Sequence, residues 1–129
     1  MFRYFSYLIL CCLAFTNTAD QATEITVGLT YKGRIEVAGD ADWAKFYLDR
    51  PGPVVITMEV PELLDYDLDL YTAEAPFGLV GTSMLDTGEK ETIRYEAPSK
   101  GWYYIKRYGF KDQHSASQYY YTQVQFEAI

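Results

Sequence analysis

The chain has 129 residues, of which 18 are Asp or Glu and 11 are Lys or Arg, giving a formal net charge of −7 at pH 7. This acidity disfavours nucleic acid and anionic membranes as partners, because both carry the same sign of charge. A basic protein surface or a divalent cation fits better. Cys11 and Cys12 are the only cysteines, so no disulfide framework or cysteine-ligated zinc site is expected in the rest of the chain.

Residues 1–19 are typical of a secretory signal peptide. Arg3 carries the one charge of this segment, residues 5–15 are almost continuously apolar, and Ala19 offers a small residue for cleavage. The segment is short for a bilayer span, so a stable membrane anchor is not expected, although an uncleaved anchor is the alternative. We therefore expect a secreted or periplasmic protein in which residues 20–129 form a single domain.

Beyond this leader, short runs of β-branched and aromatic residues alternate with turn residues about every ten positions. The turn residues include Gly39-Asp40, Pro51-Gly52-Pro53 and Thr87-Gly88. Strands are predicted at residues 25–30, 33–37, 43–48, 54–60, 66–71, 79–83, 91–95, 102–108 and 118–126. This pattern predicts an all-β sandwich of eight or nine mostly antiparallel strands.

The first motif along the chain is a turn that leads into the strand predicted at residues 43–48. It reads Gly39-Asp40-Ala41-Asp42 and is followed by Trp43. Asp side chains in such turns commonly accept hydrogen bonds from nearby backbone amides, so Asp40 and Asp42 have a structural interpretation that needs no ligand. We expect Trp43 to lie in the core.

The second motif is strictly alternating and spans residues 65–71. Its three aspartates, Asp65, Asp67 and Asp69, are expected on one side of a strand, about 7 Å apart at each step. At that spacing, adjacent charges repel by about 0.6 to 2.4 kcal/mol. If the row is partly buried, it needs a cation, basic neighbours or hydrogen-bond donors. Calcium accepts six to eight oxygen ligands and is the cation that suits it.

The third motif, Gly101-Trp102-Tyr103-Tyr104-Ile105, opens the strand predicted at residues 102–108. Residues two apart in a strand share a face. Either Tyr103 and Ile105 point inward, or their neighbours do. In the first case Trp102, Tyr104 and Tyr108 form an exposed aromatic strip suited to a sugar, a proline-rich chain or a protein surface. The opposite register is equally simple.

The single histidine, His114, lies in a polar stretch with Asp112, Ser115 and Ser117. A Ser-His-Asp triad can be assembled from these residues on paper, but the sequence has no nucleophile elbow to support it. A glycosidase-like carboxylate pair is defined by spatial separation, so sequence spacing does not test it. We expect no catalytic activity, and a small carboxylate hydrolase is the weakest alternative.

Taken in order, the three motifs resemble the bacterial pre-peptidase C-terminal domain, and the resemblance spans about residues 25–126. It implies a jelly-roll-like β-sandwich that usually serves as an accessory module on secreted peptidases, with relatives among the collagen-binding domains of clostridial collagenases. Some of those relatives bind calcium. Carried over residue by residue, Asp40 and Asp42 match the first motif of the family, Asp67 and Asp69 the second, and Tyr103 and Tyr104 the third. The candidate metal ligands are Asp67 and Asp69, with Asp40 or Asp42 completing the set. Two features depart from the family pattern: these 129 residues include no peptidase, and only Asp20 and Glu24 supply acidic groups before the first strand.

The sequence therefore predicts a secreted, non-catalytic binding or accessory module. In this prediction, calcium stabilises the fold through the four aspartates, or the aspartates are purely structural. The module recognises a protein or an extracellular polymer through Trp102, Tyr104 and Tyr108. The alternative is a stand-alone inhibitor or chaperone-like partner of a secreted peptidase.

Overall fold

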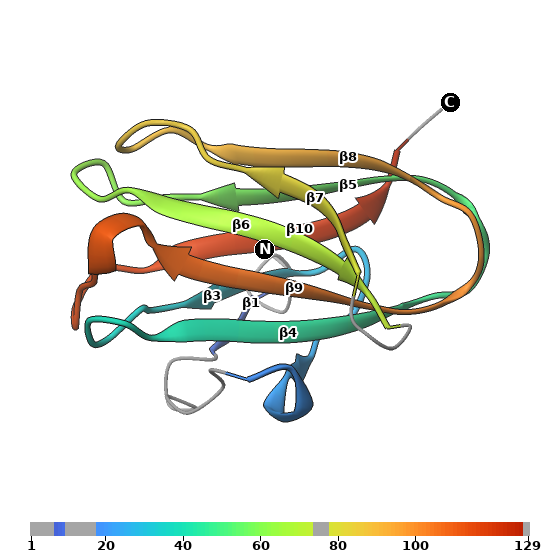
Figure 1. The fold of residues 1–129 in the computed structure, drawn as a ribbon, viewed down its shortest axis with the longest axis horizontal. Coiled ribbons are helices and arrows are strands. Elements are labelled where there is room, and N and C mark those ends of the chain that lie inside the picture. The colour runs from blue at the N-terminus through green and yellow to red at the C-terminus, as the bar shows by residue number, and fades with distance from the viewer. Residues whose placement is uncertain (1–6, 10–17, 74–77, 128–129) are drawn as a thin grey trace.

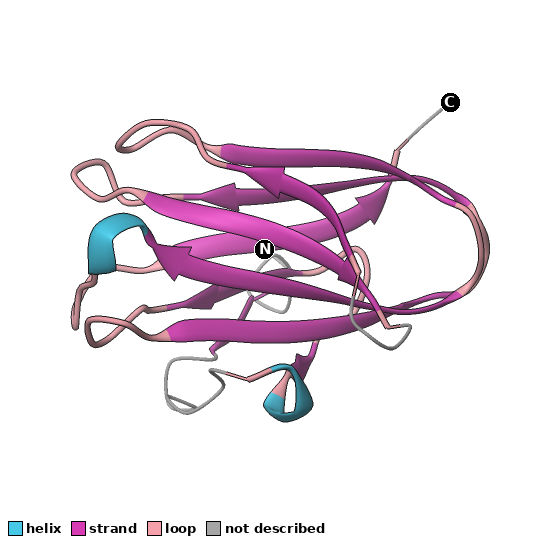
Figure 2. Ribbon diagram, viewed as in Figure 1, coloured by secondary structure: helices cyan, strands magenta, loops and turns pink. Residues whose placement is uncertain are grey.

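The computed structural model describes residues 7–9, 18–73 and 78–127. These residues form two five-stranded sheets packed face to face (Figure 1). The back sheet contains, in spatial order, β1 (Tyr7–Ile9), β3 (Thr30–Gly33), β10 (Tyr120–Phe126), β5 (Gly52–Glu59) and β8 (Glu91–Ala97). The front sheet contains β2 (Thr23–Glu24), β4 (Ala41–Leu48), β9 (Gly101–Gly109), β6 (Tyr66–Thr72) and β7 (Leu79–Ser83). Two 3₁₀ turns, η2 (Ala19–Gln21) and η3 (Phe110–Asp112), complete the described elements (Figure 2).

The strand pairing is that of a jelly roll. β3 pairs with β10, β4 with β9, β5 with β8 and β6 with β7, and each of these pairs is antiparallel. The chain thus resembles one long hairpin, in which β3 to β6 form one arm and β7 to β10 form the other. The hairpin is wrapped so that successive strand pairs alternate between the two sheets. Only the short outer strands β1 and β2 are paired in parallel within the described residues. The predicted all-β, mostly antiparallel sandwich is confirmed.

Seven of the nine predicted strands are present within a few residues of their expected bounds. The two at residues 25–30 and 33–37 are wrong, because the chain turns twice where their apolar residues suggested extension. Gly28 adopts a φ of +97°, and the Leu29 amide donates to the Thr26 carbonyl at 3.2 Å. A second turn is closed by the Asp40 amide, which donates to the Val37 carbonyl at 3.2 Å. Only β3 remains between these turns.

The core lies between the sheets and is made of alternate residues from both. The alternation is clear in β5, where Val54, Ile56 and Met58 are buried and the residues between them are less so. In β6, Tyr66, Leu68 and Leu70 are fully buried, and Asp67 and Asp69 between them are also largely buried. Burying side chains of this size contributes about 1.5–3 kcal/mol each. Other fully buried side chains from both sheets are Tyr31, Phe46, Leu48, Ile105 and Tyr120.

Part of the segment predicted as a signal peptide belongs to the described fold. Residues 7–9 form β1, which lies alongside β3 at the edge of the back sheet. The cleaved leader stays a prediction, and its removal would make β3 the edge strand. Among the described residues, no helix has the length and apolar character needed to cross a membrane.

Candidate metal centre and aromatic face

Three segments meet at one end of the sandwich, on the left in Figure 1: residues 60–65 before β6, residues 84–90 before β8, and η3 after β9. Hydrogen bonds tie them together. The Gly88 amide donates to the Leu64 carbonyl at 2.7 Å, and the Phe110 amide donates to the Asp65 carbonyl at 2.9 Å. The Asp65 amide in turn donates to Oε1 of Gln113 at 2.8 Å. The backbone of Asp65 is therefore held from two sides.

Gly88 allows two of these loops to approach closely. Its φ is +75°, and a Cβ at this position would collide with the backbone of Glu62. Any other residue would suffer both the unfavourable φ and the collision. The glycine therefore fixes the position of residues 84–90 over the start of β6.

Three acidic side chains converge at this end. Carboxylate oxygens of Asp65, Asp67 and Glu91 lie within 4.8 Å of one another. The three residues are only 9%, 3% and 0% exposed, respectively. Asp65 and Asp67 belong to the front sheet and the segment before it, whereas Glu91 begins β8 of the back sheet. The cluster, named here the acidic end cluster, therefore bridges the two sheets.

The acidic end cluster is poorly supplied with hydrogen-bond donors. Glu91 is the best satisfied, because its Oε1 accepts from the Ser83 hydroxyl at 2.5 Å and from the Leu85 amide at 3.1 Å. Within the described part of the chain, Oδ1 of Asp65 is buried without a hydrogen-bond partner. Asp67 has the carboxylates of Asp65, Glu91 and Asp69 as charged neighbours. Burying an acceptor such as Oδ1 of Asp65 without compensation is costly.

The pKa values of the three clustered carboxyl groups are raised by their burial and by the charges of neighbouring carboxylates. Burial raises the pKa of Asp67 to about 6, and the neighbouring carboxylates of Asp65, Glu91 and Asp69 add to the effect. Burial also raises the pKa of Asp65, with a further contribution from Asp86. The pKa of Glu91 is raised chiefly by burial, against the opposing effect of its hydrogen bonds. Each group thus resists carrying its charge next to the others.

A cavity of about 260 Å³ adjoins the cluster. Asp65 and Asp67 form part of its wall, together with Met84, Leu85, Asp86 and Phe110. Two of the three clustered carboxylates are thus placed beside space that a ligand can enter. A fourth acidic residue, Asp86, is on the exposed loop that forms the rim.

Asp69, a predicted metal ligand two residues beyond Asp67, has different surroundings. Its Oδ1 accepts from the Thr82 hydroxyl at 2.7 Å and from the Tyr108 hydroxyl at 3.3 Å. Its Oδ2 accepts from the Tyr71 hydroxyl at 3.4 Å. Burial and the charge of Asp69 raise the pKa of Tyr108 and Tyr71, so both phenols remain donors. Asp69 is therefore satisfied by hydroxyl groups.

Asp42 points into the sandwich interior. It is the register partner of Arg107 on β9, and Arg107 is the partner of the core residue Leu68 on β6, so all three share the inner face. The carboxylate of Asp42 accepts from the Tyr120 hydroxyl at 2.5 Å. Nε of Arg107 donates to the Asp42 carbonyl at 3.3 Å, and Nη1 to the Thr122 hydroxyl at 3.5 Å. This buried group is named here the polar core centre.

Of the four predicted metal ligands, the structure brings only Asp67 into the acidic end cluster. Asp40 lies half-exposed in the turn between β3 and β4, where burial and Glu36 raise its pKa. Asp65 and Glu91, which the sequence did not select, complete the cluster instead. Metal binding by the four aspartates stays a prediction.

The outer face of the front sheet carries six aromatic side chains. Residues Tyr103, Ile105 and Arg107 of β9 are buried, so the alternate residues of that strand point outward. Trp43 also lies on this face, half-buried rather than in the core as expected, because Asp42 occupies the inward position. The set, named here the aromatic face, comprises Trp43, Tyr47, Tyr71, Trp102, Tyr104 and Tyr108.

Members of the aromatic face contact one another across strands. The ring centroids of Trp43 and Tyr71 are 5.1 Å apart, and those of Tyr47 and Trp102 are 5.3 Å apart. Two lysines lie over the rings: Nζ of Lys45 is 5.1 Å from the Trp102 centroid, and the Lys106 ammonium is 4.9 Å from that of Tyr108.

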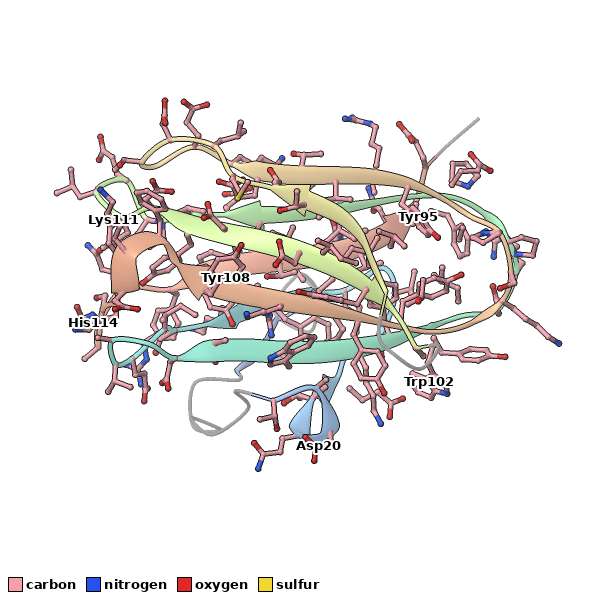
Figure 3. All side chains as sticks on the ribbon, viewed as in Figure 1. Asp20, Tyr95, Trp102, Tyr108, Lys111 and His114 are labelled. Atoms are coloured by element: carbon pink, nitrogen blue, oxygen red, sulfur yellow. The ribbon has the colours of Figure 1, made fainter. Side chains whose placement is uncertain are left out.

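Trp102 and Tyr108 are near opposite ends of β9, so the face runs along the whole strand (Figure 3). Trp102 also borders a cavity of about 340 Å³, together with Thr72, Pro98 and Lys100. The predicted ligand-binding residues are thus outward-facing, and their role in binding stays a prediction.

The polar stretch around His114 makes local contacts. Nδ1 of His114 is 2.9 Å from the carbonyl oxygen of Asp112. The Ser115 hydroxyl accepts from the amides of Ser117 and Gln118 at 3.2 and 3.0 Å. These contacts account for the residues as a loop structure.

Comparison with solved structures identifies the architecture. The pre-peptidase C-terminal domain of a collagenase from Bacillus anthracis is similar to this chain, with a TM-score of 0.67 and 17% identity over 80% of this chain and 93% of that domain. The fold is that of a pre-peptidase C-terminal domain. The resemblance predicted from the three motifs is therefore confirmed at the level of fold. No family model and no curated protein matches the chain.

Two further solved structures share the fold. CorA, a surface-associated copper-binding protein important in copper acquisition by Methylomicrobium album BG8, gives a TM-score of 0.62 at 9% identity, over 82% of this chain and 98% of CorA. PliG from Salmonella Typhimurium, a periplasmic inhibitor of g-type lysozyme, gives 0.51 at 18% identity, over 82% of this chain and all of PliG. One fold thus carries several different functions.

Proposed function

We propose that this chain is a non-catalytic, secreted or periplasmic binding module that recognises a protein partner through the aromatic face. The six outward aromatic side chains carry the proposal. Trp and Tyr dominate the binding energy of protein interfaces, because they bury a large area at a low cost in side-chain entropy. The similar domains from a collagenase and a lysozyme inhibitor support a role outside catalysis.

The composition of the aromatic face favours a protein over a small molecule. Its residues cover a sheet surface on β4, β9 and β6, and small ligands usually need a deep, enclosed pocket. Lys45 and Lys106 add positive charge to the surface of an otherwise acidic chain. A partner that offers apolar groups interspersed with carboxylates complements this arrangement.

The proposal is tested by binding to two immobilised proteins, collagen and g-type lysozyme, measured for wild type, Trp102→Ala and Tyr121→Ala. Tyr121 is the matched control, because it is an outward tyrosine on the opposite sheet. We expect wild type to bind at least one of the proteins, and Trp102→Ala to weaken that binding by about 30-fold. The Tyr121→Ala variant should bind as wild type does. Absence of binding to both proteins, or equal losses in the two variants, would contradict the proposal.

A second candidate is a stand-alone inhibitor or chaperone-like partner of a secreted enzyme, and the similarity to PliG favours it. The two candidates differ in their effect on the bound enzyme. An inhibitor abolishes lysozyme or peptidase turnover at saturation, whereas an accessory module leaves turnover unchanged. Enzyme assays with increasing amounts of the purified protein therefore separate them.

A further inference from the structure

We propose that the acidic end cluster is a calcium site in which Asp65, Asp67 and Glu91 bind one ion and so connect the two sheets. The proposal does not rest on the partner proposed for the aromatic face, although Asp67 lies opposite Tyr108 of that face. The site also differs from the ligand set predicted from the sequence, sharing only Asp67 with that set. Its new members are one residue from the segment before β6 and one from the opposite sheet.

The geometry of the three carboxylates suits a single cation. Their oxygens lie within 4.8 Å of one another, and two oxygens bound to one calcium ion at 2.3–2.6 Å each are at most about 5 Å apart. The residues come from two sheets whose positions are fixed by the surrounding strands and by the loop contact at Gly88. The ligands are therefore largely in place before the ion binds.

A second observation, separate from the clustering, points to a ligand. Asp65 is 91% buried, and its Oδ1 has no hydrogen-bond partner within the described residues. Asp67, which is 97% buried as a residue, lines the adjoining cavity and so lies beside space that an ion can enter. Carboxylates that serve only a structural role are normally satisfied by donors, as Asp69 is by three hydroxyl groups. A bound cation supplies the missing interaction.

The donor set selects the type of ion. All three side chains offer hard oxygen atoms, which suit calcium, magnesium or manganese better than copper or zinc. Calcium accepts irregular arrangements and completes its shell with water, for which the adjoining cavity of about 260 Å³ has room. Magnesium requires a nearly ideal octahedron at shorter distances and dehydrates reluctantly. An irregular set of ligands from two sheets therefore favours calcium.

Glu91 can keep its present hydrogen bonds while binding the ion. Oε1 accepts from the Ser83 hydroxyl, and the Leu85 amide is shared between Oε1 at 3.1 Å and Oε2 at 3.2 Å. A carboxylate has about four lone-pair positions across its two oxygens, so positions remain for an ion. These donors orient the carboxylate toward the cluster. Asp65 and Asp67 then supply the remaining charge.

The test measures thermal unfolding of the purified protein in EDTA, in calcium and in magnesium. With calcium a hundredfold above its Kd, the Tm should rise by about 10 °C or more, because the ion binds only the folded state. Magnesium at the same concentration should give a clearly smaller rise. Terbium luminescence excited through tyrosine provides a second readout, which calcium should displace.

Three variants assign the ligands. Asp67→Asn and Glu91→Gln should lose most of the calcium-dependent rise and the terbium signal. Asp69→Asn is the matched control from the same strand, and it should keep both even if its Tm in EDTA is lower. Because Asp67→Asn removes a repelled charge, it should remain folded without calcium, so the loss of response does not reflect misfolding.

Several results would overturn the proposal. One is an unchanged Tm in millimolar calcium together with no calcium-displaced terbium signal. Another is an equal rise with magnesium, which would reject calcium as the selected ion. A third is loss of the response in Asp69→Asn but not in Asp67→Asn, which would place the ion elsewhere on β6.

Discussion

Two acidic centres of this sandwich, both derived from the aspartate-rich motifs, differ in how their charge is satisfied. In the polar core centre, Asp42 accepts a hydrogen bond from Tyr120 and lies opposite Arg107 on the neighbouring strand. In the acidic end cluster, Asp67 has Asp65 and Glu91 as its close charged neighbours. The first centre contains a cation and hydrogen-bond donors among its own residues, whereas the second is proposed to take an ion from solution.

The difference arises from strand register. Asp42 faces inward, so β9 and β10 of opposite sheets can supply Arg107 and Tyr120 to it. Asp67 lies near the start of β6, where loops replace strands as neighbours and the closest side chain from the other sheet is acidic. Two similar motifs therefore have different roles, one in folding and one proposed for ion binding.

The largest expected effect comes from removing the cation of the polar core centre. Arg107→Met would leave the buried Asp42 without its neighbouring positive charge. The polar core centre would then resemble the acidic end cluster, in which a buried carboxylate has no cation beside it among the described residues. We expect a loss of about 3–5 kcal/mol in the free energy of unfolding, measured by urea denaturation. Arg94→Met is the control, because Arg94 pairs with Glu127 on the surface, and it should cost about 1 kcal/mol or less. Similar losses in the two variants would contradict the assigned role of Arg107.

A smaller effect is expected where the loops meet over the acidic end cluster. Gly88→Ala combines an unfavourable φ with a collision against Glu62, and it should destabilise the protein by about 2 kcal/mol. Gly39→Ala separates the two causes, since Gly39 also has a positive φ but open space around it. Its cost should be about 1 kcal/mol. If both variants lose the same amount in thermal unfolding, the close loop contact is not needed.

Removing the Tyr120 hydroxyl, a single hydrogen-bond donor, is a smaller change to the polar core centre than removing Arg107. Tyr120→Phe leaves Oδ2 of Asp42 without its hydroxyl partner, which should cost about 1–3 kcal/mol. Tyr103→Phe is the matched control, because that hydroxyl donates to the neutral carbonyl of Ser99. Its cost should be nearer 1 kcal/mol. A larger loss in Tyr103→Phe, measured by urea denaturation, would argue against a charged Asp42.

The strands that carry both centres could be predicted from the sequence because their two faces differ in chemistry. Alternation placed β6 and β9 within two residues of their observed bounds. The inward face of β9 could not be chosen in advance, since Trp102 and Tyr104 are as apolar as Tyr103 and Ile105. The structure shows the reason for the observed register. Arg107 reaches acceptors on Asp42 and Thr122 in the interior.

The membership of the acidic end cluster could not be predicted. Glu91 follows Gly88-Glu89-Lys90, a polar run typical of an exposed turn, and nothing local marks it as buried. It reaches Asp67 only because the jelly roll brings the start of β8 next to the start of β6. Asp65 was visible in the motif, but its unpaired oxygen is a property of the packed loops.

The most direct measurement compares the free energy of unfolding of Asp67→Asn and Asp42→Asn with wild type, all in EDTA. Asp67→Asn should stabilise the protein by about 1 kcal/mol, because it removes a buried charge whose charged neighbours are the carboxylates of Asp65, Glu91 and Asp69. Asp42→Asn should destabilise it by about 1–3 kcal/mol, because it weakens the bond from Tyr120 and removes the negative charge of the residue opposite Arg107. Destabilisation of both variants by similar amounts would contradict the division into one satisfied centre and one that requires an ion.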